Sequence, residues 1–109
     1  MKLFANWDEI ETIHLETMDR KIYTGENIML VRNEIFPKAV VPVHNHYHEQ
    51  MLYVVSGECD VTTEGETKHL KASEMALFPS DAKHSVVNTL DEVLVAIDIF
   101  SPIREDFLK

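Results

Sequence analysis

Short apolar runs alternate with polar turns along most of this chain. The runs are rich in Val, Ile, Leu, Tyr and Phe, and each is bounded by Gly, Pro, Asn, Asp or Ser. Runs of this length and composition predict strands at residues 27–36, 50–58, 59–65, 67–72, 75–79, 84–88 and 92–100. Only the stretch WDEIETI, residues 7–13, suggests a helical turn. The pattern therefore predicts a mostly-β protein.

Turn residues separate the predicted strands at regular intervals, for example at residues 25–27, 56–57 and 79–81. Many short strands at such spacing are typical of antiparallel sheets packed as a sandwich or barrel. A chain of 109 residues without repeats, low-complexity segments or linkers is expected to form a single domain. We divide it into an N-terminal strand or arm region (1–24), a barrel (25–100) and a C-terminal segment (101–109).

Composition and charge exclude several classes of function. The net charge is −9, from 19 acidic and 10 basic residues with no cluster of Lys or Arg, so nucleic acid is not expected as a partner. No apolar run approaches the ~20 residues that span a bilayer, so no membrane association is expected. The single cysteine, Cys59, cannot form an internal disulfide, and no secretory leader opens the chain, so a cytoplasmic location is expected.

Polar residues interrupt the apolar pattern most sharply at VHNHYHEQ, residues 43–50. Residues two apart on a strand share a face, so a strand here would turn its three histidines and Gln50 the same way. Three imidazoles and an amide in a small core are costly unless something satisfies their nitrogens. One divalent transition metal ion, such as Zn, Ni, Mn or Fe, does so, and His44 and His46 supply two neighbouring ligand positions.

A further ligand has to come from elsewhere in the chain, and His84 is the best candidate. It follows the turn FPSDAKH at the start of another apolar strand. Pro79 and the Ser80-Asp81 pair predict a tight turn that aims the side chain rigidly. A strand paired across a barrel would bring His84 opposite His46. The sequence thus predicts a metal site with ligands from two separate strands.

Residues 41–88 resemble the cupin superfamily in two separate motifs. The first motif is His-X-His, then Glu or Gln, then Gly, matched by His44-Asn45-His46, Gln50 and Gly57. The second is Gly, Pro, Gly, His and Asn, matched by Ser73, Pro79, Asp81, His84 and Asn88. Ser73 and Asp81 replace two glycines of the second motif. Both can occupy a turn, and Asp tolerates a left-handed backbone better than most residues.

The resemblance implies a small, single-domain, all-β jelly-roll barrel (a double-stranded β-helix) with the metal inside. Small cupins of this type look like homodimers in which N-terminal strands pack or exchange across the interface. The apolar segment MKLFANW, with Trp7, suits that role or packs onto the barrel of its own subunit. A dimer would also cover exposed edge strands.

Gln50 departs from many cupins, which have a glutamate at this position. A neutral ligand leaves more positive charge on the metal, and this favours Lewis-acid chemistry over oxygen activation. A cupin dioxygenase is the second functional hypothesis, and it requires Glu49, which faces away from Gln50 on a regular strand, to swing in. A non-enzymatic module that binds a metal or a small ligand is the third.

A narrower resemblance lies in the HEQ stretch and in the C-terminal IDIFSPIREDFLK, which are similar to small cupins of the KdgF type. Those relatives act on unsaturated uronates released from pectin and alginate. The implied reaction opens the ring of a 4,5-unsaturated uronate, a small sugar acid, and converts the enol to a linear keto acid. The resemblance implies a metal held by His44, His46, Gln50 and His84, with Asp98, Phe100 and Arg104 lining the same cavity.

Two of these side chains have chemistry that matches the reaction. Asp98 lies on the apolar strand VLVAIDIF, where burial would raise its pKa toward a value useful for moving protons. Arg104 can grip the substrate carboxylate with two parallel hydrogen bonds, or tie down the C-terminus with Asp106. His48 has three open roles: a metal ligand, a cavity group that acts as acid/base or contacts substrate, or a residue in a bulge that points outward.

Residues outside these motifs receive structural interpretations. Met29, Met51 and Met75 lie within apolar runs and are expected to be packing residues. His14 and His69 lack any motif context and are expected on the surface.

Overall fold

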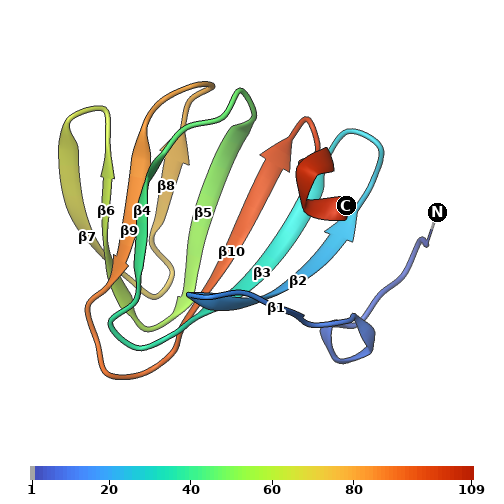
Figure 1. Ribbon diagram of the computed structural model, residues 1–109, viewed down its shortest axis with the longest axis horizontal. Helices are drawn as coiled ribbons and strands as arrows, with labels where there is room; N and C mark the ends of the chain where they lie inside the picture. The colour runs from blue at the N-terminus through green and yellow to red at the C-terminus, as the bar shows by residue number, and fades with distance from the viewer. Residues whose placement is uncertain (1) are drawn as a thin grey trace.

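Two antiparallel β-sheets make up the fold of residues 2–109, which this computed structural model describes (Figure 1). The six-stranded sheet has the order β1 (Ile13–His14), β2 (Met18–Thr24), β3 (Met29–Ile35), β10 (Leu94–Ser101), β5 (Glu49–Ser56) and β8 (Met75–Phe78). The four-stranded sheet has the order β4 (Val40–His44), β9 (His84–Asn88), β6 (Glu58–Thr63) and β7 (Glu66–Lys71). The loop that joins β4 to β5 therefore crosses from one sheet to the other.

All seven predicted strands form, as β3 and as β5 to β10, with ends that shift by at most two residues. The predicted helical turn reduces to the 3-10 turn η1 (Trp7–Glu9), and a second 3-10 turn, η2 (Glu105–Leu108), lies near the C-terminus. No helical segment in residues 2–109 is long and apolar enough to cross a membrane. The prediction of an all-β barrel built from two antiparallel sheets is confirmed.

Three strands have no counterpart among the predicted ones, namely β1, β2 and β4. The sequence of β2, MDRKIYT, carries three consecutive charged residues that break the apolar alternation, and β4 contains Pro42. β2 nevertheless pairs with β3 along its whole length, and β4 pairs with β9. Pairing within a sheet thus outweighs the weak strand propensity of both segments.

The inward-facing positions of the sheets form the core. Along β3, β5 and β10 buried positions alternate with more exposed ones, so that Val31, Val54 and Leu94 point inward. Several polar side chains are buried among these apolar ones, and burial is costly for a polar group without a partner. They are Asn33, His48, Gln50, His84, Asn88 and Asp98.

Two of the three methionines interpreted as packing residues are not buried, so that prediction is wrong for them. Met29 is fully buried, but Met51 is 52% exposed and Met75 is 62% exposed. The inner face of β5 belongs to Leu52 and Val54, and the two-residue period of a strand turns Met51 outward. The outer face of the six-stranded sheet is therefore apolar where β10, β5 and β8 lie side by side.

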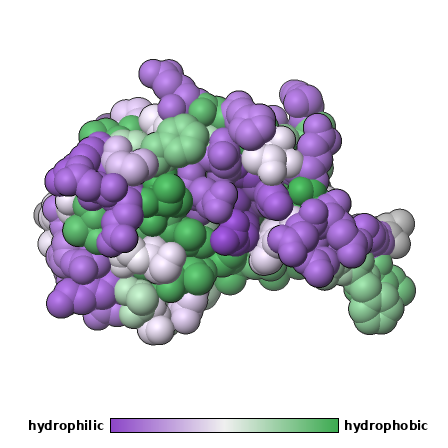
Figure 2. All heavy atoms as spheres, turned by 90° about the horizontal axis from the view of Figure 1, so that it is seen from below, coloured by the Kyte–Doolittle hydropathy of each residue, from purple (hydrophilic) through white to green (hydrophobic). Residues whose placement is uncertain are grey.

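The N-terminal arm runs away from the two sheets and ends well to one side of them (Figure 1). It is anchored near its base, where the Lys21 ammonium donates a hydrogen bond to the Trp7 carbonyl at 2.7 Å. Trp7 is half-buried, whereas Leu3 and Phe4 are 76% and 85% exposed. Figure 2 shows apolar side chains standing free at the tip of this extension.

Candidate metal and substrate site

Three histidines from separate segments meet in one cluster. His44 ends β4, His84 begins β9, and the two are direct partners in the antiparallel pair. His46 comes from the loop between β4 and β5. One ring nitrogen from each histidine lies within 4.8 Å of the other two, so the group can hold a metal ion.

Residues 43–50 do not form one continuous strand, so the spacing of two residues on a strand is not what aligns the histidines with Gln50. β4 ends at His44, and the chain then bends as it crosses to the six-stranded sheet. His46 and Gln50 meet nonetheless, with Nε2 of His46 3.0 Å from Oε1 of Gln50. The strand partner of His84 is His44 rather than His46, although the His46 and His84 ring centroids are only 4.9 Å apart. The candidate ligands therefore come from both sheets.

Backbone carbonyls fix the tautomer of all three imidazoles. Each Nδ1 atom lies at hydrogen-bond distance from a carbonyl oxygen, at 2.8 Å for His44, 3.0 Å for His46 and 2.9 Å for His84. A carbonyl can only accept, so each Nδ1 carries the hydrogen and donates it. In the neutral ring the lone pair is then on Nε2, which is the form that binds a metal.

The donor set fits a divalent ion for a second reason. Nε2 of His46 and Oε1 of Gln50 face each other, and both are acceptors when the ring is neutral. Burial lowers the pKa of His46, and burial with the nearby histidines lowers the pKa of His84 to about 4, so both rings are neutral near pH 7. Within residues 2–109, Nε2 of His84 is buried without a hydrogen-bond partner. A first-row divalent ion among these atoms would satisfy all of them.

His48 does not belong to the histidine cluster, but it is not turned to solvent either. Its side chain is buried, with a relative exposure of 5%, and its ring stacks on Tyr47 at a centroid distance of 3.9 Å. In the described part of the chain its Nδ1 atom has no partner. The outward bulge is therefore ruled out, whereas Glu49 is exposed and faces away from Gln50 as expected.

Asp98 supplies a carboxyl group inside the barrel. Oδ2 of Asp98 accepts a hydrogen bond from Nδ2 of Asn33 at 2.8 Å, whereas Oδ1 has no partner within residues 2–109. Burial raises the pKa of Asp98 to about 6, although the Gln50 side chain and the Arg20 guanidinium oppose the rise. A carboxyl group of this kind can hold or release a proton near neutral pH.

Arg104 lies beside the site but is already engaged. Its Nε and Nη2 atoms donate to the two carboxylate oxygens of Asp106 at 3.1 and 2.9 Å. Its guanidinium also lies over the rings of Phe107 and Phe100, 4.1 and 5.1 Å from their centroids. The pair with Asp106 is the anchoring of the C-terminal segment that the sequence offered as the alternative role for Arg104.

Comparison with known proteins places this geometry in a family. A cupin domain model matches residues 32–100. The chain belongs to the cupin family. The predicted membership is confirmed, and with it the similarity to KdgF-type cupins.

The cupin similarity extends along nearly the whole chain. Over 104 residues the chain is 36% identical to the pectin degradation protein KdgF of Dickeya dadantii, covering 94% of this chain and 90% of that protein. The solved structure of KdgF from Halomonas sp. superposes with a TM-score of 0.89 and 32% identity, covering 98% of this chain and 99% of that one. An RmlC-like cupin from Shewanella frigidimarina gives a TM-score of 0.91 and 30% identity, covering 98% and 96%.

The two glycine replacements in the second cupin motif keep the backbone that glycine would adopt. Ser73 and Asp81 have φ angles of 74° and 64°, both in the left-handed region. The amide of Asp81 donates to the His46 carbonyl at 2.8 Å, so this turn holds the loop that carries a candidate ligand. Asn88 is buried, and its side-chain amide donates to the carbonyls of Phe36 and Glu92 at 3.0 and 2.9 Å. The second motif is therefore largely structural around His84.

A cavity of about 60 Å³ inside the cupin barrel joins the candidate groups. Two side chains that the sequence analysis overlooked, Arg20 and Asn33, line it as well. The signal for Asn33 was a polar residue at an inward position of β3, where its neighbours at that spacing are apolar. Arg20 gave no signal, because β2 was not predicted. The polar side chains that line the cavity are Arg20, Asn33, His44, Gln50, His84, Asp98 and Arg104.

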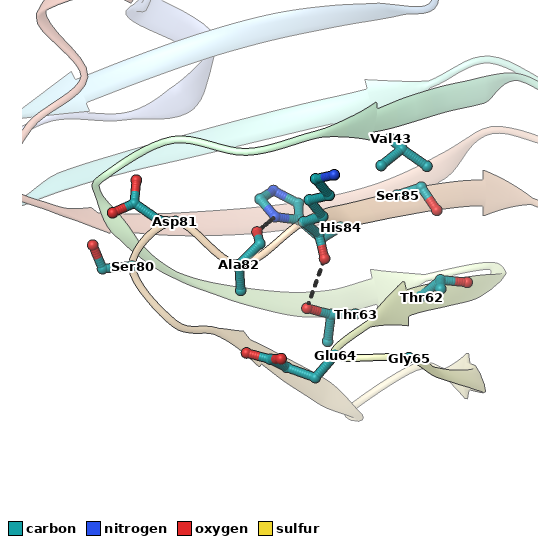
Figure 3. A pocket seen from close by; sticks show the side chains of 11 residues that line it. Val43, Thr62, Thr63, Glu64, Gly65, Ser80, Asp81, Ala82, His84 and Ser85 are labelled. Carbon is teal, nitrogen blue, oxygen red and sulfur yellow. Dashed lines mark hydrogen bonds between the residues drawn. The ribbon is translucent and has the colours of Figure 1, made fainter.

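A wider groove of about 520 Å³ lies on the other side of His84 (Figure 3). Figure 3 shows the Thr63 hydroxyl bonded to the carbonyl beside His84, that of Lys83, at 3.1 Å. His84 is the one member of the histidine cluster among the residues that line this groove, and neither Gln50 nor Asp98 lines it. The hydrogen bond from Thr63 supports the start of β9. Gln50 and Asp98, which could take part in a reaction, line the inner cavity instead.

Proposed function

We propose that this cupin is a metal-dependent enzyme that opens 4,5-unsaturated uronates and converts them to linear keto sugar acids. The observation that carries the proposal is the inner cavity. His44 and His84, two of the three histidines that could hold a metal, line it together with the buried carboxyl group of Asp98. The 36% identity to a pectin degradation protein supports this substrate class, because pectin is a polymer of uronates.

We assign the metal to four side chains. A divalent ion held by the three imidazoles and Gln50 would act as a Lewis acid that stabilises negative charge on substrate oxygens. The neutral amide of Gln50 keeps the donor set uncharged, which suits this role better than oxygen activation. Phe100 and Arg104, which line the cavity, would contact the bound sugar acid. We propose the same role for His48, whose ring centroid lies 6.5 Å from that of Phe100.

Asp98 is the residue that we expect to move protons. The reaction is an isomerisation: the C1–O5 bond breaks as the C1 hydroxyl loses its proton, and the enol at C5 becomes a ketone as C4 gains a proton. No further reactant is consumed. Oδ1 of Asp98 has no hydrogen-bond partner within residues 2–109, and the raised pKa lets the carboxyl group take up and return a proton near neutral pH. Asn33 holds the other oxygen and keeps the carboxyl in place.

The proposed activity predicts faster loss of ultraviolet absorbance from the conjugated enol acid. The assay gives metal-loaded protein 4,5-unsaturated galacturonate and compares the rate with the spontaneous one and with chelator-treated protein. We expect loss of absorbance well above the spontaneous rate only in the metal-loaded sample. Oxygen consumption by the Fe(II)-loaded protein would favour a dioxygenase instead, and a rate equal to the spontaneous one would remove the proposed function.

We also propose that the protein is a homodimer. The outer face of β5, β8 and β10 is a hollow of about 520 Å³. Its walls carry no charged side chain and consist of Met51, Leu52, Tyr53, Val55, Met75, Ala76, Leu77, Ile97 and Ile99. In a two-fold dimer the same patch meets itself, so an uncharged apolar patch suits a second copy of a chain with net charge −9.

Replacing Met75 with glutamate is expected to dissociate this dimer. The substitution would bury a carboxylate without a partner in an apolar interface, which costs several kcal/mol, so the dimer should weaken at least about 100-fold. Size-exclusion chromatography with light scattering measures the mass. Ile28→Glu is the matched control, because Ile28 is 59% exposed in a turn outside the patch. A Met75→Glu variant that keeps the wild-type mass would contradict the proposed interface.

A further inference from the structure

Arg20 is a cation in the inner cavity that neither cupin motif contains. It lies on β2 opposite Asn33 of β3, and it lines the same cavity as His44, His84 and Asp98. Its guanidinium carbon sits 3.9 Å from the centroid of the Phe107 ring. Stacking on an aromatic face holds the plane of a guanidinium group without using its N–H donors.

In the described part of the chain, the N–H groups of Arg20 form only long hydrogen bonds. Nε donates to Oδ1 of Asn33 at 3.4 Å, and Nη2 approaches the sulfur of Met18 at 3.9 Å, so both contacts are long. No carboxylate of residues 2–109 forms an ion pair with Arg20, whereas Arg104 has a two-point pair with Asp106. The carboxyl groups of Asp98 and Asp106 are near enough to favour the charge on Arg20, but neither is in direct contact with it. A half-buried guanidinium without a direct ion pair is costly, and an anionic ligand would lower that cost.

Asn33 links Arg20 to the proposed proton carrier. Its amide oxygen accepts from Arg20, and its amide nitrogen donates to Oδ2 of Asp98 at 2.8 Å. The Asn33 side chain therefore lies between the Arg20 guanidinium and the Asp98 carboxyl group and sets the spacing between them. In a 4,5-unsaturated uronate the carboxylate is attached to C5, one bond from the double bond that must gain a proton. A residue that holds the carboxylate near Asp98 also holds the reacting carbons there.

We infer that Arg20, rather than Arg104, binds the carboxylate of the substrate and selects sugar acids over neutral sugars. The inference rests on the proposed function for the identity of the substrate. Among residues 2–109, the edge formed by Nη1 and Nη2 contacts only the Met18 sulfur, and weakly, so it can offer two parallel donors to a carboxylate. Arg104 remains paired with Asp106 and orders the C-terminal segment.

The test compares the acid with its neutral analogue. Turnover of 4,5-unsaturated galacturonate and of its methyl ester is measured for wild type, Arg20→Met, Arg20→Lys and Arg104→Met. Losing charge-assisted hydrogen bonds costs about 10- to 100-fold in binding, so Arg20→Met should raise KM for the acid by that factor and change KM for the ester by less than about 3-fold. Arg20→Lys keeps the charge without the planar fork and should recover part of the preference for the acid.

Arg32→Met is the matched control, because Arg32 lies on the opposite face of β3 from Asn33 and pairs with Glu34. It should keep the wild-type preference. Circular dichroism and thermal unfolding establish that each variant is folded. If Arg104→Met loses the preference for the acid while Arg20→Met keeps it, the inference is overturned.

A binding experiment separates this inference from the proposed function. Galacturonate and galactose lack the reactive double bond, and calorimetry measures their binding to metal-loaded protein. Tighter binding of galacturonate that is lost in Arg20→Met supports the carboxylate site even if the wild type turns over no uronate. Equal binding of the two sugars to the wild type, or a galacturonate preference that survives in Arg20→Met, overturns it.

Discussion

Replacing His84 with alanine will abolish metal binding and reduce uronate conversion to the spontaneous rate. Nε2 of His84 is buried and has no hydrogen-bond partner in the part of the chain that the structure describes, and Nδ1 donates to the Ala82 carbonyl. The ring can therefore offer the lone pair of Nε2 to a metal. Loss of residues around a metal ligand typically lowers affinity by about 10- to 100-fold, and loss of a ligand should exceed that range. We therefore expect metal affinity to fall by more than about 100-fold.

Elemental analysis after dialysis reports the metal content of the variant, and the ultraviolet assay reports its activity. His84 stacks face to face on Phe78 at a centroid distance of 4.1 Å, so a folding check by circular dichroism is part of the experiment. His69→Ala is the matched control. His69 lies outside the cavity, where it bridges Glu58 and Asp60 at 2.7 and 2.8 Å. Full metal content in folded His84→Ala would rule out the assigned ligand set.

The strands were predictable where an apolar run of strand length lies between turn residues. β5 and β10 show the two-residue period clearly, since Leu52 and Val54 alternate with more exposed positions. The same rule misplaced Met51, because β5 is apolar on both faces and periodicity does not say which is inside. β2 was missed because Asp19, Arg20 and Lys21 follow one another in a segment ordered by its pairing with β3.

The sequence identified which residues meet at the candidate site, but not how the backbone brings them together. The motifs pointed to His44, His46, Gln50 and His84, and the structure brings their side chains together. The bend after His44 was not predictable from the pattern, because alternating histidines suggest a straight strand. Nor were the carbonyls that fix each tautomer, since backbone acceptors leave no mark in the sequence. Arg20 reaches the cavity only through sheet pairing.

Replacing Asp98 with asparagine will remove activity while leaving the metal bound. The amide has the shape of the carboxyl group and can still accept the hydrogen bond from Asn33, but it cannot carry a proton. General acid–base catalysis contributes about 100- to 10,000-fold, so kcat should fall within that range. Elemental analysis and the ultraviolet assay measure the two effects separately. Asp106→Asn is the comparison variant, because it makes the same chemical change at a carboxylate that does not line the cavity. Metal loss in Asp98→Asn would assign Asp98 a structural role at the metal.

The pH dependence of stability supplies a second readout for Asp98. Its folded pKa of about 6 lies above the ordinary value of 3.8, so the folded protein keeps a proton that the unfolded chain releases. The contribution of this proton to stability is fully present below about pH 4 and is lost as the pH rises through 6. The free energy of unfolding should fall by roughly 3 kcal/mol over this range for this reason alone. Denaturant titrations of metal-free wild type and metal-free Asp98→Asn measure the free energy of unfolding at each pH. The histidines titrate in both proteins, so their contribution cancels when the two values are subtracted. The asparagine variant has no such proton to lose, so its stability should not fall for this reason. Its free energy of unfolding minus that of the wild type should therefore increase between about pH 4 and pH 6. A constant difference would mean that the cavity does not hold Asp98 protonated, and the proton-transfer role would lose its physical basis.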